Sequence, residues 1–187
     1  VIFNGKKIMK KILFFLSISS LIINFKVDGQ NAIVVNKCLE CHKKLVEKKV
    51  IHKPVIDECD KCHQSNGKEH PKEDVEGFAL IKEVPQLCYS CHDEKNILKE
   101  QVHSPVKEGD CFSCHAVHSS NAEHLLSAAL PGLCNSCHTD LQKTIETASV
   151  EHRAVKDGKS CLNCHLPHSS AEKKILIQPE PDVCFTC

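Results

Sequence analysis

Apolar residues are distributed unevenly along the chain. One mostly apolar run, residues 12–25, follows Lys10 and Lys11, whereas the rest of the chain is polar with short apolar patches. A charged start, an apolar stretch and a small-residue exit near Gly29 are typical of a secretory signal peptide starting at Met9. The run is shorter than the roughly 20 residues of a membrane span. We therefore expect residues 1–29 to hold upstream residues and a leader, with an uncleaved membrane anchor as the alternative.

Beyond the leader, the pattern predicts little regular secondary structure. No long alternating run indicates a strand, and the apolar spacing favours helices over residues 123–130 and 133–148, the second just after Pro131. Several prolines indicate turns between short elements. We expect a mainly α chain of short helices and loops.

The composition indicates that the interior needs more than side chains. After residue 29 the aromatic residues are Phe78, Tyr89, Phe112 and Phe185, which is few for a core of this size. Removing the leader takes away five of the 24 basic residues and one of the 24 acidic residues, which leaves a net charge of −4. Because nucleic-acid binders carry a basic surplus, we expect no nucleic-acid partner.

All cysteines of the chain belong to one motif. The 14 cysteines form seven C-x-x-C pairs, and histidine directly follows six of them. The seventh pair ends at Cys187, and we expect a histidine to come next. In order, the seven motifs are Cys38, Cys41 and His42; Cys59, Cys62 and His63; Cys88, Cys91 and His92; Cys111, Cys114 and His115; Cys134, Cys137 and His138; Cys161, Cys164 and His165; and Cys184 and Cys187.

C-x-x-C-H is the attachment motif of c-type haem. Two thiols three positions apart lie on one helical turn and can each form a thioether with a haem vinyl group, while the next histidine ligates the iron. Zinc ribbons are an alternative, since C-x-x-C supplies half of a tetrahedral zinc site, but they give no reason for the histidine. Disulfides within each pair would close loops too small to stabilise a fold. The motifs therefore predict about seven covalently bound haems c.

The motifs are arranged in a repeat. Residues 50–95, 101–141 and 150–187 each begin with a histidine in H-x-[PA]-V, carry a first C-x-x-C pair seven to nine residues later, and carry a second pair after P-x-[LV]. We call these segments modules 1, 2 and 3. Two modules share C-H-x-x-H-S-S, ending at Ser120 and Ser170, and residues 30–49 resemble the second half of an incomplete copy.

The doubled pattern resembles the doubled CXXCH family of multihaem c-type cytochromes, over residues 38–187. The resemblance implies a multihaem cytochrome c fold, with short helices and loops wrapped around stacked haems. Departures from the pattern are the longer first module, Ala154 in place of proline, and the final motif without its histidine.

Seven histidines outside the motifs are candidates for the second axial position of the irons. Methionine ligation is excluded after the leader, because Met9 is the single methionine of the chain. We therefore expect bis-histidine ligation and low potentials. His118 and His168 follow a motif histidine by three residues and so lie on the same side of a turn, which indicates that each serves a neighbouring haem inside its module. The expected distal ligands are His52, His70, His103, His118, His152 and His168, and His124 is left open between ligand and surface residue.

Two classes of function are compatible with this chemistry. The first is an exported electron carrier, on the periplasmic or extracellular side of a bacterial envelope. Its expected partners are redox proteins, such as other cytochromes or a reductase, or further copies in a haem-stacked oligomer. The second is a multihaem oxidoreductase of the nitrite or hydroxylamine type, or its membrane-anchored donor subunit. Such enzymes mark a catalytic haem by an altered motif or a tyrosine cross-link. The six complete motifs are unaltered and Tyr89 lies inside a motif, which favours the carrier.

Overall fold

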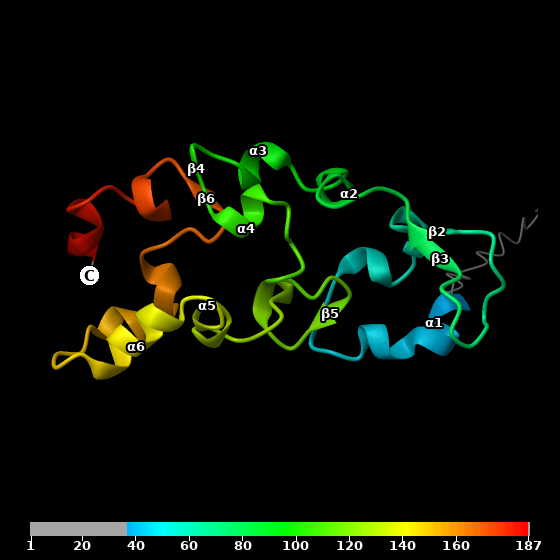
Figure 1. The fold of residues 1–187 in the computed structure, drawn as a ribbon, viewed down its shortest axis with the longest axis horizontal. Helices are drawn as coiled ribbons and strands as arrows, with labels where there is room; N and C mark the ends of the chain where they lie inside the picture. Colours follow the sequence, from blue (N-terminus) through cyan, green and yellow to red (C-terminus); the bar gives the residue numbers. More distant parts are fainter. Residues whose placement is uncertain (1–36, 187) are drawn as a thin grey trace, which may run out of the picture. The chain divides into compact units, whose positions relative to one another are not determined.

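The computed structural model describes residues 37–186, so the predicted leader lies outside the described residues. Its helices are short, and the longest is the nine-residue α6. The α-helices are α1 (Lys37–His42), α2 (Gln86–Tyr89), α3 (Glu94–Ile97), α4 (Ser104–Lys107), α5 (Gly132–Asn135) and α6 (Thr139–Thr147) (Figure 1). The 3-10 helices are Lys43–Val46, Lys53–Val55, Cys59–Lys61, Glu123–Leu125, Arg153–Val155, Ser160–Asn163, Lys173–Ile175 and Asp182–Thr186. This confirms the expectation of little regular structure.

Local sequence explains where several helices begin and end. Asp93 caps α3, because its carboxylate accepts a hydrogen bond from the Lys95 backbone N–H at 3.0 Å. Pro105 lies in the first turn of α4, where a missing N–H costs nothing. The chain leaves α4 through Gly109, whose φ of +77° is accessible to glycine at little cost.

Both longer helices predicted from the sequence are wrong in extent. Residues 123–130 form one 3-10 turn, Glu123–Leu125, because His124 and Leu125 have positive φ values of 55° and 58°. Residues 133–148 are divided into α5 and α6 by a break at residues 136–138. The break falls inside the fifth motif, so the second half of that motif lies between two helices.

Within residues 37–186 there are three two-stranded antiparallel pairings, and two of them join segments far apart in the sequence. Strand β1 (Val50–Ile51) pairs with β5 (Ser119–Ser120), and β4 (Gln101–Val102) pairs with β6 (Ser169–Ser170). The third pairing, β2 (His63–Ser65) with β3 (Phe78–Leu80), closes the insertion of module 1 (Figure 1). The first two pairings each join the start of one module to the middle of the next.

The described residues bury few apolar side chains. Val55, Leu176 and Val183 are the buried apolar residues, whereas Phe112 and Phe185 are 50% and 80% exposed. Five serines are buried instead: Ser119, Ser120, Ser160, Ser169 and Ser170. Within residues 37–186, no helix has the length and apolar character needed to cross a membrane. Side chains alone therefore form no sizeable core in this part of the chain.

Candidate haem-binding sites

The second to sixth motifs each form a single helical turn. In each, the backbone N–H of the second cysteine donates to the carbonyl of the first at 3.2–3.4 Å. In four of them, the histidine N–H also donates to the carbonyl of the first cysteine at 2.9–3.1 Å: His92, His115, His138 and His165. This i to i+4 bond fixes the imidazole one turn beyond the first thiol. The two thiols and the imidazole of a motif are thus held as one local unit.

Thiols of consecutive motifs lie close together. Burial, with the adjacent Cys161 thiol, raises the pKa of Cys134 to about 11. Burial and the adjacent Cys111 thiol likewise raise the pKa of Cys88. The thirteen described cysteines form no disulfide bond with one another. The attachment points of motifs three and four, and of motifs five and six, are therefore neighbours in space.

The leading histidine of a module faces the second motif of the same module. The ring centroids of His52 and His92 are 6.1 Å apart, with 21° between the ring planes. His103 and His138 repeat this arrangement at 6.1 Å and 16°. The same relation therefore holds in modules 1 and 2.

The first motif of a module faces the module that follows. His63 of module 1 lies 6.2 Å from His118 of module 2, and His115 of module 2 lies 5.8 Å from His168 of module 3. The expectation that His118 and His168 tie haems together inside their own modules is therefore wrong, because these contacts bridge modules. Turn geometry excluded His115 as the partner of His118, because the two rings lie on the same side of one turn. It did not indicate which other motif histidine His118 faces.

The same relation extends to the N-terminal segment. His42 of the first motif lies 5.9 Å from His70, the module 1 counterpart of His118 and His168. The motif that ends at His42 is therefore placed like the first of the two motifs in a module. The sequence had suggested that it corresponds to the second.

Hydrogen bonds fix the tautomer of four rings. The Nδ1 atoms of His52 and His103 lie 3.0 and 3.1 Å from the carbonyl oxygens of Val117 and Pro167. Those of His115 and His165 lie 3.0 Å from the carbonyl oxygens of His124 and Lys174. Because a carbonyl oxygen only accepts, each Nδ1 carries the proton and donates it. The Nε2 lone pair of each of these rings is then available to a metal.

Burial favours the neutral form of the bridging histidines. Burial, together with the neighbouring His63 and His52 imidazoles, lowers the pKa of His118. Burial, with His115 and His103, lowers the pKa of His168 in the same way. Neutral imidazole is the form that binds metals, so the environment prepares both rings for ligation.

Buried serines hold the segments that carry these histidines. The Ser120 hydroxyl donates to the Leu126 carbonyl and accepts from the Ala122 N–H at 3.0 Å. Ser170 makes the equivalent bonds to Leu176 at 2.5 Å and from Glu172 at 2.9 Å. The sequence displayed this repeat as H-S-S, but the pattern alone gave the serines no role.

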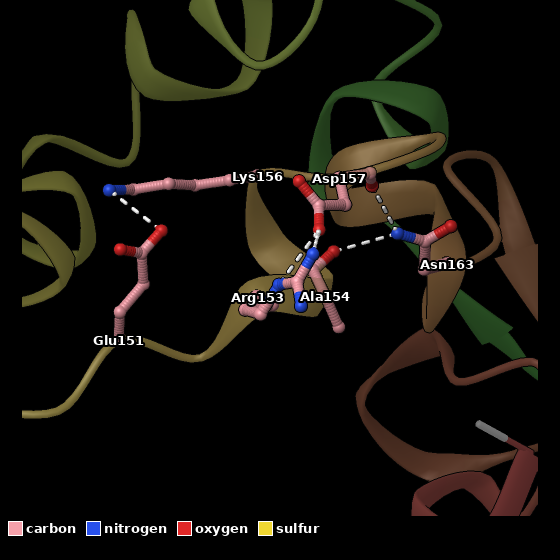
Figure 2. Close-up of polar contacts among 6 residues, drawn as sticks. All are labelled: Glu151, Arg153, Ala154, Lys156, Asp157 and Asn163. Atoms are coloured by element: carbon pink, nitrogen blue, oxygen red, sulfur yellow. Dashed lines mark hydrogen bonds and ion pairs between the residues drawn. The ribbon is translucent and has the colours of Figure 1, made fainter.

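A side chain inside the sixth motif connects it to the start of module 3. The Asn163 amide donates to the Ala154 and Asp157 carbonyls at 2.7 and 2.8 Å (Figure 2). The exposed pairs Arg153–Asp157 and Lys156–Glu151, at 3.1 and 2.9 Å, lie beside it. Such exposed pairs contribute little, so the amide is the main connection. It joins the sixth motif to the helix after His152.

Three histidines face no motif histidine in the described part of the chain. His124 contributes its backbone carbonyl to His115, and Lys174 does the same for His165 with a similar φ of 58°. His124 and Lys174 therefore occupy equivalent positions that share a backbone conformation and a carbonyl contact. The structure does not bring the His124 ring to a motif. His152 lines a cavity of about 680 Å³ with Thr186 of the seventh motif. His165 is the motif histidine with no facing ring among residues 37–186.

These arrangements fit haem. A metal–imidazole bond is about 2.0–2.1 Å, and the ring centroid lies about 1 Å further out, so two rings on opposite sides of one metal have centroids about 6 Å apart. The five facing pairs have separations of 5.8–6.2 Å. In contrast, no group of three or more His, Cys, Asp or Glu side chains within residues 37–186 is arranged to hold a metal ion.

Comparison with known proteins assigns this architecture to a family. Helical-turn C-x-x-C-H motifs with facing histidines are typical of haem-binding proteins of the c type. The family model of the doubled CXXCH motif matches residues 52–97, 103–143 and 152–187. The chain belongs to this family, the multihaem c-type cytochromes with covalently bound haem c, which confirms the resemblance found in the sequence. No curated protein matches the chain.

Proposed function

We propose that the chain is an exported electron carrier with about seven haems c, most of them ligated by two histidines. Haem iron supplies one-electron chemistry, by cycling between ferric and ferrous states. The residues of the chain attach, orient and insulate each haem. The facing histidine pairs at 5.8–6.2 Å carry this proposal, because each combines one motif histidine with one histidine from elsewhere in the chain.

Each pair assigns two ligands to one haem. The motif histidine would hold the iron as the proximal ligand, and the ring opposite would hold it as the distal ligand. Distal His52 and His103 are oriented by the carbonyls of Val117 and Pro167, which keep Nε2 directed away from the backbone contact. With both axial positions filled by protein, such haems bind no substrate, which favours a carrier over an oxidoreductase.

The close thiols of consecutive motifs support short distances between haems. Cys88 with Cys111, and Cys134 with Cys161, bring the attachment points of successive haems together. Electrons would then pass along the order of the motifs in the chain. Redox proteins on the periplasmic or extracellular side of the envelope are the proposed donors and acceptors.

Haem counting tests the proposal. We expect about seven haems per chain when a histidine follows Cys187, measured as haem absorbance per protein mass after export with the haem-attachment machinery. Replacing Cys59 and Cys62 by alanine in one variant, and Cys88 and Cys91 in another, should each remove one haem. Three haems per chain, with one of these variants losing none, would contradict two haems per module. A spectrum dominated by high-spin iron would contradict bis-histidine ligation.

A further inference from the structure

One interface occurs twice between modules. The two residues before a leading histidine pair with the two serines of the next module: Val50–Ile51 with Ser119–Ser120, and Gln101–Val102 with Ser169–Ser170. The backbone N–H groups of His52 and His103 then donate to the carbonyls of His118 and His168 at 2.9 and 3.0 Å. We call residues 118–120 and 168–170 the His-Ser-Ser segments. Each segment therefore supplies a short strand, backbone acceptors and a facing imidazole.

Module 3 has the two residues before its leading histidine, but no His-Ser-Ser segment within residues 37–186 pairs with them. Val150–Glu151 precedes His152 as Val50–Ile51 precedes His52, but it pairs with no strand among the described residues. Val150 is 81% exposed, whereas Val50, its counterpart in β1, is partly buried. The ring of His152 has no hydrogen bond within residues 37–186, in contrast to His52 and His103.

In the same module, the histidine of the sixth motif has no facing ring within residues 37–186. His165 is held by the Lys174 carbonyl as His115 is held by that of His124, so its Nε2 is equally prepared for iron. His115 faces His168 of the next module, but no ring in the described chain faces His165. Within residues 37–186, no strand pairs with this edge and no ring faces His165, whereas in modules 1 and 2 a single segment does both.

We propose that residues 150–152 and the haem at His165 together form a docking site for the His-Ser-Ser segment of one further doubled CXXCH module. The segment would add a strand to Val150–Glu151 and place its histidine opposite His165. This inference rests on the proposed bis-histidine haems. It adds a specific site at which one cytochrome module completes the ligation of another.

A second copy of this chain does not fit as the occupant. Its two His-Ser-Ser segments are already paired with β1 and β4, and their serines are 3–5% exposed. Releasing one would break its strand pairing and the backbone hydrogen bond to its histidine carbonyl, and releasing residues 168–170 would also break the bond from the Ser169 hydroxyl to the Ile97 carbonyl. The occupant is therefore a further module whose His-Ser-Ser segment is not already paired with a strand.

Strand addition and iron ligation make the site selective. Backbone pairing to an exposed edge provides affinity with little sequence preference, as in other cases of β-augmentation. The imidazole adds selectivity, because a segment without histidine pairs with the edge but leaves the iron without its sixth ligand. Covering Val150 adds a smaller apolar contribution.

A peptide titration tests the proposal. The protein is the haem-loaded chain with Cys184→Ala and Cys187→Ala, so that only the six complete motifs attach haem. Before peptide is added, we expect one haem per chain to bind carbon monoxide. The probe is a synthetic peptide with the sequence of residues 167–176, in which His168 is the single histidine. We expect it to convert that haem to the low-spin form and to suppress carbon monoxide binding.

Two controls locate the binding site. The same peptide with His168→Ala should leave the high-spin signal unchanged. Val150→Asp in the protein should weaken binding of the unmodified peptide about tenfold, by removing apolar contact and disturbing the edge. Leu141→Asp, at an apolar residue of α6 that is 55% exposed, should not change it.

The outcomes separate this inference from the proposed function. If all six haems, including the one at His165, are low-spin without peptide, the proposed docking site is contradicted and the carrier proposal stands. If most haems bind carbon monoxide, the bis-histidine proposal itself fails. Dimerisation of the chain without peptide, with loss of the high-spin signal, would identify a second copy as the occupant and overturn the assignment.

Discussion

At the scale of residues, the histidines differ in what their ring nitrogens contact. His115 and His165 are motif histidines whose Nδ1 protons are held by backbone carbonyls one loop later. His52 and His103 lie outside the motifs, and the next module holds their Nδ1 protons. A ring with one nitrogen fixed in this way has a defined orientation before a metal binds. Counting histidines in the sequence could not distinguish these cases.

Replacing His118 by alanine should leave one haem iron without its distal ligand. His118 faces His63 at 6.2 Å, so the haem at Cys59 and Cys62 should lose its distal ligand. We expect one further equivalent of carbon monoxide to bind per chain, measured by optical titration against the unchanged protein. Adding Cys59→Ala and Cys62→Ala to this variant should abolish the extra equivalent.

His124→Asn is the matched control for this substitution. Asparagine tolerates the positive φ of 55° at this position, and the backbone carbonyl that holds His115 remains. We expect no change in carbon monoxide binding. An extra equivalent in His124→Asn, or none in His118→Ala, would show that the ligand assignment is wrong.

Replacing Ser120 by alanine should destabilise the segment of module 2 that pairs with module 1. Ser120 is 4% exposed and its hydroxyl bonds to Leu126 and Ala122, so loss of the hydroxyl leaves a buried carbonyl and a backbone N–H without partners. We expect the free energy of unfolding of the haem-loaded protein to fall by about 1–3 kcal/mol. Thermal unfolding followed by haem absorbance measures it. Ser136→Ala, at an exposed serine in the fifth motif, should have a much smaller effect.

At the scale of elements, the sequence predicted the local units better than their connections. The C-x-x-C-H motifs and the repeat follow from residue identity, because a motif is one helical turn. The predicted helix over residues 123–130 failed because His124 and Leu125 adopt positive φ, which aims the His124 carbonyl at His115. Residue propensity carries no signal for that requirement. The pairing of β1 with β5 depends on contacts across 70 residues, which local patterns do not contain.

Gly109 offers a test at the scale of elements. It ends α4 with a φ of +77°, and a Cβ added there would lie 2.8 Å from the Pro85 Cδ atom. Pro85 precedes the third motif and Gly109 precedes the fourth, so a side chain at Gly109 would push these two segments apart. Gly109→Ala should lower the free energy of unfolding by about 1–3 kcal/mol, through backbone strain and this clash. Denaturant unfolding of the haem-loaded protein measures it.

Gly132→Ala provides the matched control at a motif-bearing helix. Apart from its chain neighbours and the backbone of its own helix, no atom lies within 4 Å of a Cβ added at Gly132, which begins α5. Alanine should be neutral or slightly stabilising there, because it restricts the unfolded chain. Equal destabilisation in the two variants would mean that the Pro85 contact has no special role.

At the scale of the whole molecule, the described residues lack a conventional core. Val55, Leu176 and Val183 are buried, but large apolar residues such as Phe185 and Val150 remain exposed. Apolar burial is the main stabilising contribution to folding, and three side chains cannot offset the conformational entropy of about 150 ordered residues. We infer that the covalently attached haems supply the missing apolar surface.

Removing haem should therefore unfold the chain. When the protein is produced in a host without haem-attachment machinery and kept reduced, we expect an expanded chain, because ligation energy is also folding energy. Small-angle scattering should give a radius of gyration well above the roughly 15 Å of a compact domain of this length, towards the roughly 40 Å of an unfolded chain. Far-ultraviolet circular dichroism should show the loss of α6, since a nine-residue helix is marginal in water without tertiary contacts. The haem-loaded protein is the control, and a haem-free chain with the same radius and spectrum would show that side chains alone hold the fold.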